Sequence, residues 1–290
     1  MRFSAFEVFG ALPELKHPHG LAMLRPWVDV GSVGTLVLSR LEAHFGARQL
    51  AKLARPGMFF DFTRYRPVLY LEEGSRQLGI PNVVVSHAER EENDLVFLHL
   101  LEPHMLGERY VESVLRLLQA LKLERYWLLG SMYDMVPHTR PLMVTGIASG
   151  EDLEKQLQRL GVRHSDYQGP TTIAYLISQQ GAELGMETAT LIVHLPQYAR
   201  LDENYSGSLR LLEVVSSLYD WDIDLEEMRE KAREQTRELT LSTETNPRLK
   251  AVLEQLEDYY DRRMEAEEEP RLSPEVERFL REMGKRLGQG

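Results

Sequence analysis

Short continuous runs of apolar residues alternate with amphipathic stretches over roughly the first 200 residues. Runs without polar alternation are typical of strands buried on both faces, as in parallel sheets. Apolar residues that recur every three or four positions indicate helices with one buried face. We therefore predict one α/β domain with a largely parallel sheet flanked by helices. The pattern predicts strands at 49–53, 68–71, 82–86, 95–101, 126–129, 142–147 and 188–195, and helices at 36–45, 110–122, 151–160 and 171–184.

After about residue 205 the pattern contains helices only, each with apolar residues on one face. Ser273 and Pro274 would begin a last amphipathic helix, since serine caps helices and proline favours their first position. The predicted organisation is an α/β core over 1–205, a helical extension packed on it over 206–264, an acidic linker over 265–271 and a terminal helix over 272–290.

Composition narrows the classes of function. The chain of 290 residues has a net charge of −11, which argues against binding to nucleic-acid phosphates. It contains no cysteine, which excludes disulfides, thiolate metal sites and cysteine nucleophiles. No apolar run approaches the roughly 20 residues of a membrane helix, and Glu7 comes too early for a secretory signal. We expect a soluble cytoplasmic protein that binds neither nucleic acid nor membrane.

A glycine-containing turn, with Gly31 and Gly34, lies between a strand that contains the apolar run 21–24 and the predicted helix at 36–45. Glycines at such a turn let backbone N–H groups approach an anion at the helix N-terminus. However, Asp29 occupies the place of the first glycine of a dinucleotide-binding motif, and its carboxylate would repel phosphate. The turn therefore fits either a ligand site or close packing of the helix on the sheet.

Two prolines, Pro137 and Pro141, frame His138, Thr139 and Arg140 beyond the strand at 126–129. An imidazole can act as a general base near neutral pH, and a guanidinium can hold a carboxylate or phosphate. Ligands gather beyond the carboxyl ends of strands in open α/β sheets. The structural alternative is that these side chains bond carbonyl groups of the loop or pair with a buried acid.

Similar motifs follow other predicted strands and could converge on one rim. Glu102 follows the strand at 95–101, so an Arg140–Glu102 ion pair is one structural expectation. The chain lacks nucleotide, serine-hydrolase, zinc and calcium motifs, and we predict no catalytic residue, cofactor or metal. The candidate rim residues are Trp27, Asp29, Gly31, Gly34, Glu102, His138, Thr139, Arg140, Tyr167, Gly169, His194 and Tyr198.

The order of these motifs resembles the proteasome assembly chaperone family, specifically the family of the second chaperone. Its bacterial and archaeal members are often labelled ATP-grasp superfamily proteins. The resemblance runs from about residue 20 to about residue 260, and Pro-His-Thr-Arg-Pro is its most characteristic part. It is carried by the Trp-Val-Asp-x-Gly-x-x-Gly turn, Arg66-Pro67, Glu102-Pro103, Gly130 with 137–141, Tyr167-x-Gly169-Pro170 and His194-x-Pro196-x-Tyr198.

The resemblance implies an α/β fold akin to the nucleoside phosphorylase/hydrolase type. It also implies a homo-oligomer, with a trimer favoured, and proteasome-like subunits as partners where the host has them. On this basis we expect a non-enzymatic interaction or assembly-chaperone-like protein. The alternative is a protein or enzyme that binds a small molecule at the rim. Fold analogy suggests a nucleotide or nucleoside-like ligand.

Overall fold

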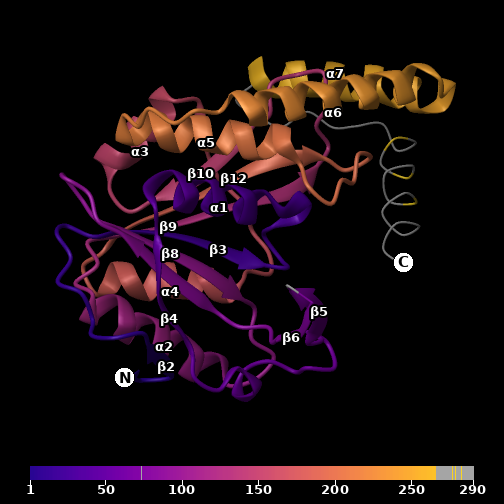
Figure 1. Ribbon diagram of the computed structural model, residues 1–290. Coiled ribbons are helices and arrows are strands. Elements are labelled where there is room, and N and C mark those ends of the chain that lie inside the picture. Colours follow the sequence, from indigo (N-terminus) through magenta and orange to yellow (C-terminus); the bar gives the residue numbers. More distant parts are fainter. Residues whose placement is uncertain (73, 266–275, 277, 279–281, 283–290) are drawn as a thin grey trace.

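The computed structural model describes residues 1–72 and 74–265 together with 276, 278 and 282, and a ten-stranded sheet lies at its centre (Figure 1). Long apolar runs form the central strands, and shorter, more polar segments form the two edges. In spatial order the strands are β1 (Arg2–Phe3), β2 (Phe6–Val8), β4 (Arg48–Leu53), β7 (Val84–Ala88), β8 (Leu95–Leu101), β3 (His19–Arg25), β9 (Arg125–Asp134), β12 (Glu187–Pro196), β10 (Val144–Ala148) and β11 (Val162–His164).

The strand directions correct the prediction of a largely parallel sheet. The central strands β8, β3, β9 and β12 are parallel, but β1, β2, β4, β7 and β8 pair antiparallel in succession, as do β12 and β10. Five of the nine neighbouring pairs in the described chain are therefore antiparallel, so the sheet is mostly antiparallel. Burial on both faces gives both kinds of strand a continuous apolar sequence, which leaves their direction open.

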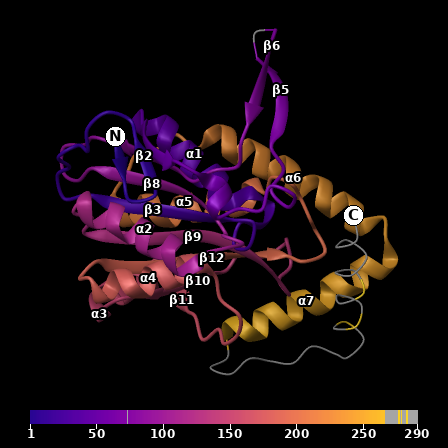
Figure 2. The same cartoon turned by 90° about the horizontal axis from the view of Figure 1, so that it is seen from below.

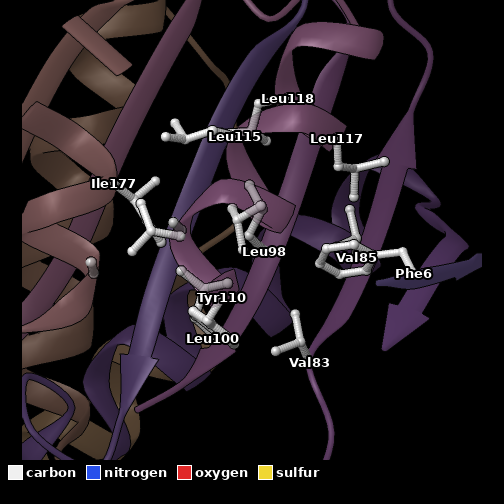
Figure 3. Packing of buried hydrophobic residues seen from close by; sticks show 14 of the residues in the cluster. Phe6, Val83, Val85, Leu98, Leu100, Tyr110, Leu115, Leu117, Leu118 and Ile177 are labelled. Carbon is white, nitrogen blue, oxygen red and sulfur yellow. The ribbon is translucent and has the colours of Figure 1, made fainter. Parts of the chain in front are cut away.

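Helices cover both faces of the sheet (Figure 1). On one face, α2 (Gly107–Ala120) and α4 (Ile173–Glu183) enclose a core that includes Leu98, Leu100 and Tyr110 (Figure 3). On the other face, α1 (Val33–Phe45), α3 (Glu151–Arg159) and α5 (Tyr205–Tyr219) pack over Trp127 and its neighbours. Two single turns of 3₁₀ helix, Val30–Ser32 and Pro56–Met58, complete the body.

Two long helices, α6 (Glu226–Glu244) and α7 (Pro247–Glu265), form an outer layer beyond α5 (Figure 1). The inner side of α7 packs Val252, Leu256 and Tyr259 against Met135 and Tyr198, which follow the ends of β9 and β12. The predicted linker over 265–271 and most of the predicted terminal helix lie outside the described residues. None of the described helices has the length and apolar character of a membrane span.

A two-stranded hairpin projects from the body (Figure 2). Its strands, β5 (Val68–Glu72) and β6 (Ser75–Gly79), pair with each other and are separate from the ten-stranded sheet. The sequence predicted the first of these strands, and the structure confirms it.

Candidate functional site

The predicted rim residues follow the carboxyl ends of the central parallel strands, which we call this edge of the sheet, but they form two separate groups. The parallel strands β8, β3, β9 and β12 all end at this edge, which brings the segments that follow them together. The first group, around Asp29 and Glu102, follows β3 and β8. The second group, around His138 and His194, belongs to the ends of β9 and β12 and lies against α6 and α7.

In the first group, the Asp29 carboxylate caps the beginning of α1. It accepts a hydrogen bond from the Thr35 backbone N–H at 3.1 Å and another from the Thr35 hydroxyl at 2.6 Å. Burial raises the pKa of Asp29, and these hydrogen bonds act in the opposite direction. The side chain therefore occupies the anion-binding position at the N-terminus of α1, which a phosphate group would otherwise take.

The glycines of the same turn serve close packing. Gly31 has a φ of +62°, and a Cβ there would lie 2.7 Å from Cβ of Asn204. A Cβ on Gly34 would lie 2.9 Å from both the Leu129 carbonyl oxygen and Cβ of Met23. Glycine at position 34 therefore lets α1 approach β3 and β9 closely, and glycine at position 31 lets the turn approach Asn204 at the start of α5. The geometry of this turn fits close packing of the helix on the sheet better than a ligand site.

Glu102 has a similar role at α4. Its two carboxylate oxygens accept hydrogen bonds from the Ile173 backbone N–H at 3.2 and 3.3 Å. Burial raises the pKa of this half-buried carboxyl group. The hydroxyl group of Tyr65 donates to the Glu102 carbonyl oxygen at 3.1 Å. The predicted Arg140–Glu102 ion pair is thus wrong, because Glu102 binds the N-terminus of α4.

The remaining residues of the first group are exposed. Trp27 has an exposed fraction of 66%, which is high for the largest apolar side chain. Tyr167 is also exposed, and its hydroxyl group donates to the Pro170 carbonyl oxygen at 3.0 Å. Gly169 lies under the Tyr167 ring, since a Cβ there would be 2.7 Å from the hydroxyl oxygen. Tyr167 and Gly169 therefore shape the turn that leads into α4.

In the second group, His138 connects three parts of the chain. Its backbone N–H donates to the Tyr198 hydroxyl oxygen at 2.8 Å, and its Nδ1 lies 2.6 Å from the same oxygen. Its Nε2 lies 3.2 Å from Oγ1 of Thr240 in α6, whose hydroxyl group donates to the Thr236 carbonyl oxygen. Burial lowers the pKa of His138, which favours the neutral ring. Because the Thr240 hydroxyl group donates elsewhere, its oxygen accepts from Nε2–H of this ring.

Thr139 and Arg140 attach the same loop to α7. The guanidinium of Arg140 donates to Asp261 from Nε at 2.9 Å and from Nη2 at 2.8 Å, and its Nη1 lies 3.3 Å from Glu257. The Thr139 hydroxyl group also donates to Glu257. The Tyr260 hydroxyl group donates to the carbonyl oxygen of Pro141 at 2.6 Å. The Pro-His-Thr-Arg-Pro segment therefore acts as an attachment point for the outer helices, with acids from α7 in place of the predicted Glu102.

His194 belongs to a buried polar network that the sequence did not predict. Its Nδ1–H donates to Oδ2 of Asp134 at 2.7 Å, and its Nε2 lies 2.8 Å from the Thr145 hydroxyl oxygen. Arg263 of α7 donates to the same carboxylate at 3.0 Å. Burial alone would raise the pKa of Asp134, but the hydrogen bond from His194 and the guanidinium of Arg263 hold it far below its usual range.

The order hydroxyl, imidazole and carboxylate in this network is that of acyl-transfer triads. However, the side chain of His194 is only 6% exposed, and α7 binds the carboxylate through Arg263. The network therefore holds α7 on the sheet.

The sequence contains weak signals for the acidic partners of Arg140 and His194, which were not predicted. Glu257 and Asp261 are four positions apart, which places both acids on one face of α7. Asp134 ends β9, which continues five residues beyond the predicted strand. None of these signals identifies Arg140 or His194 as the partner, because the separations exceed 50 residues.

Two hollows in the described part of the chain lie away from the rim. One is lined by Val252 and Gln255 of α7 and the other by Arg90 and Tyr219. Among the described residues, no group of three His, Asp or Glu side chains is arranged to hold a metal ion. The rim side chains thus bind mainly to their own chain.

The chain is similar to known proteins in sequence and in fold. A sequence profile of the PAC2 family matches residues 23–241, and no protein with a curated description matches the chain. A PAC2 family protein from Streptomyces avermitilis shares 26% identity, with a TM-score of 0.71 over 77% of this chain and 95% of its own. A proteasome-assembly chaperone homologue from Mycobacterium tuberculosis shares 23% identity, with a TM-score of 0.71 over 81% and 99% of the two chains.

The archaeal proteasome activator PbaB from Pyrococcus furiosus has the same fold at 16% identity, with a TM-score of 0.64 over 82% of this chain and 98% of its own. These structures support the resemblance to proteasome assembly chaperones that the order of motifs indicated. The matched region begins within β3, ends within α6 and includes all the rim residues. The chain therefore belongs to the PAC2 family.

Proposed function

We propose that this protein acts through protein–protein contacts, as an assembly-chaperone-like protein without catalytic turnover, and that it does so as a homo-oligomer. The observation that carries the proposal is the internal use of the polar rim. Asp29 and Glu102 bind the N-termini of two helices, and His138 and Arg140 bind α6 and α7. Side chains held in this way stabilise the fold and are poorly placed to take up a substrate.

Exposed apolar side chains at the same edge support a protein partner. Trp27 follows β3, Met105 and Leu106 follow β8, and Tyr167 precedes α4. Large apolar groups in water favour association, and aromatic residues and methionine are enriched at protein interfaces. This edge therefore supplies an exposed apolar surface for a protein partner.

The partner that we propose is a proteasome subunit. The proposal rests on the PAC2 family match and on fold neighbours described as a proteasome-assembly chaperone homologue and a proteasome activator. The acidic net charge of −11 is compatible with a protein partner and disfavours a nucleic-acid one.

Titration with proteasome α and β subunits of the source organism tests this proposal. Size-exclusion chromatography with light scattering should show a stoichiometric complex. The double variant Trp27→Ser/Met105→Ser should lose the complex while its melting temperature stays near that of the wild type, since both side chains are already exposed. Failure of the wild type to bind any subunit, or a source genome without proteasome genes, would contradict the proposed partner.

One observation favours a second candidate, a nucleotide or nucleoside-like ligand. Glu102 is a half-buried carboxyl group with a raised pKa at the carboxyl end of β8, and perturbed acids of this kind gather at functional sites. A thermal-shift screen with nucleosides and nucleotides distinguishes the candidates. A rise in melting temperature that Glu102→Gln abolishes would favour the small ligand over the purely structural role of Glu102.

A further inference from the structure

One residue beyond α7, Val276, is buried against that helix. Its side chain is only 3% exposed, and it belongs to an apolar cluster with Val252, Leu256 and Tyr259 of α7. Residues near the end of a chain are normally exposed unless a specific contact holds them. Val276 therefore marks a contact between α7 and the segment 272–290, which we call the terminal segment.

The contact follows one stripe of α7. A hollow of about 250 Å³ lies between α7 and the terminal segment, lined by Arg248, Ala251, Val252 and Gln255 on one side and by Val276 and Arg278 on the other. The four positions of α7 recur at three and four residues, so they share one face of that helix. The backbone at Val276, Arg278 and Glu282 is helical, with Val276 buried and the other two residues exposed. The described positions of the terminal segment are thus those of a helix whose apolar residue is turned towards α7.

The sequence of the terminal segment fits the same orientation. Its apolar residues recur at three and four positions, which predicts a helix with a single apolar stripe. The stripe consists of Val276, Phe279, Leu280, Met283 and Leu287. Val276 is the member of this stripe that the structure describes, and it is the residue that contacts α7.

We propose that the terminal segment docks as an amphipathic helix along α7 of its own chain, with its apolar stripe against the stripe of α7 that contains Val252 and Gln255. The docked segment extends the apolar cluster that joins α7 to Met135 and Tyr198, which follow the ends of β9 and β12. It thereby secures the outer layer to the sheet, and a protein partner could use this stripe of α7 only by displacing it. The inference is independent of the proposed function.

Chain length allows the terminal segment to reach α7 of the same molecule. Val252 lies 13 positions before Glu265, the last residue of α7, which is about 20 Å along the helix. Ten residues connect Glu265 to Val276, and they can span up to about 36 Å. A tethered segment has an effective concentration on the order of 1 mM, whereas a second copy in a micromolar solution is roughly a thousandfold more dilute. The same contact therefore forms within one chain in preference to between two chains.

The charges of the terminal segment and the outer helices have opposite sign. Residues 276–290 contain four bases and two acids, a net charge of +2. The helices α6 and α7 together contain eleven acids and eight bases, a net charge of −3. Opposite net charges favour the approach of the segment to the outer helices, and apolar contact then sets its position.

Cross-linking of engineered cysteines tests the contact, because the chain contains no cysteine of its own. In Gln255→Cys/Arg278→Cys both positions are exposed and line the same hollow, so a short bismaleimide should join them. Intact mass should show a single chain with one bridging linker, at roughly tenfold or more the yield of Lys250→Cys/Arg278→Cys. Lys250 is exposed on the opposite side of α7 from this stripe and is the matched control. Equal yields from the two pairs, or a linked dimer as the main product, would overturn the proposal.

Hydrogen exchange tests whether the terminal segment secures α7. Val276→Asp places a charge in the cluster with Val252 and Leu256, so amides in 247–265 should exchange several-fold faster while those of the central strands stay unchanged. Arg278→Ala is the matched control, since this residue is exposed, and it should leave the exchange of α7 unchanged. Unchanged exchange of α7 in Val276→Asp would overturn the proposal. Neither measurement uses a proteasome subunit, so failure of the proposed function would leave both results intact.

Discussion

Arg140 donates two hydrogen bonds to the carboxylate of Asp261, at 2.9 and 2.8 Å, although the two residues are 121 positions apart. Such a bidentate pair fixes both the distance and the orientation of its partners. It joins the loop after β9 to the outer helix α7, and Glu257 adds a second carboxylate at 3.3 Å. The most characteristic motif of the sequence therefore sets the position of α7 on the body.

Arg140→Ala should loosen α7 without unfolding the sheet. The reason is that the loop then loses its bidentate bond to Asp261, whereas the apolar contacts of Val252 and Leu256 remain. Hydrogen exchange of the amides in 247–265 should become several-fold faster. The matched control is Arg262→Ala, which removes an Arg–Asp pair within α7 itself. Equal exchange in the two variants would mean that the loop does not hold the helix.

Asp134→Asn should destabilise the fold by about 3 kcal/mol at neutral pH, because it leaves Arg263 and His194 without their buried carboxylate. The folded pKa of Asp134 lies below the unfolded value, so the carboxylate stabilises the fold above about pH 4 and loses this effect as pH falls further. Urea denaturation from pH 7 to pH 3 should show the two proteins converging in acid. A difference that stays constant with pH would contradict this role.

His138→Ala should lower the stability by about 2 kcal/mol, since Tyr198 and Thr240 each lose a hydrogen-bond partner. The folded pKa of His138 lies below that of the unfolded chain, which therefore binds the additional proton. The contribution of His138 is thus present above about pH 6.5 and declines as pH falls below it. Thermal melts at pH 7.5 and pH 5.5 measure the difference between wild type and variant. A variant that melts like the wild type but loses a bound ligand would instead assign His138 to a ligand site.

Gly34→Ala should cost about 1–3 kcal/mol, because its Cβ would meet the Leu129 carbonyl oxygen and Cβ of Met23 and push α1 from the sheet. Gly107→Ala is the matched control at the start of α2, where the nearest atom is Cδ1 of Ile173 at an ordinary 3.6 Å. That variant should be neutral or slightly more stable than the wild type. Chemical denaturation of both proteins is the measurement. Equal stability of the two variants would contradict a packing role for Gly34.

The apolar pattern predicted most elements, because burial and periodicity follow from local sequence. All seven predicted strands are present, as are the four predicted helices of the core. The apolar run 21–24, which precedes the glycine-containing turn, lies in β3. The missed strands β1, β2 and β11 have only two or three residues, and β6 contains Arg76 and Gln77, so none of these four has a strong apolar run. Strand direction was the larger error. Only six residues separate Ala88 from Leu95, too few for the crossover that a parallel pair requires.

The contacts of the predicted rim residues could not be predicted from the sequence. The sequence singled out Asp29, Glu102, His138 and Arg140, and each makes specific hydrogen bonds in the structure. Their partners come from elements that are separated along the chain by loops and helices, and apolar periodicity carries no information about such pairings. The same limit explains why Asp261 was not foreseen as the partner of Arg140.

Native mass spectrometry of freshly purified protein, before and after denaturation, tests the central claim most directly. We expect an assembly of more than one chain whose mass equals a whole number of copies, with no small molecule released on denaturation. A single chain that releases a stoichiometric small molecule would contradict the proposed function, because the rim would then be a ligand site and the protein would act without a second copy.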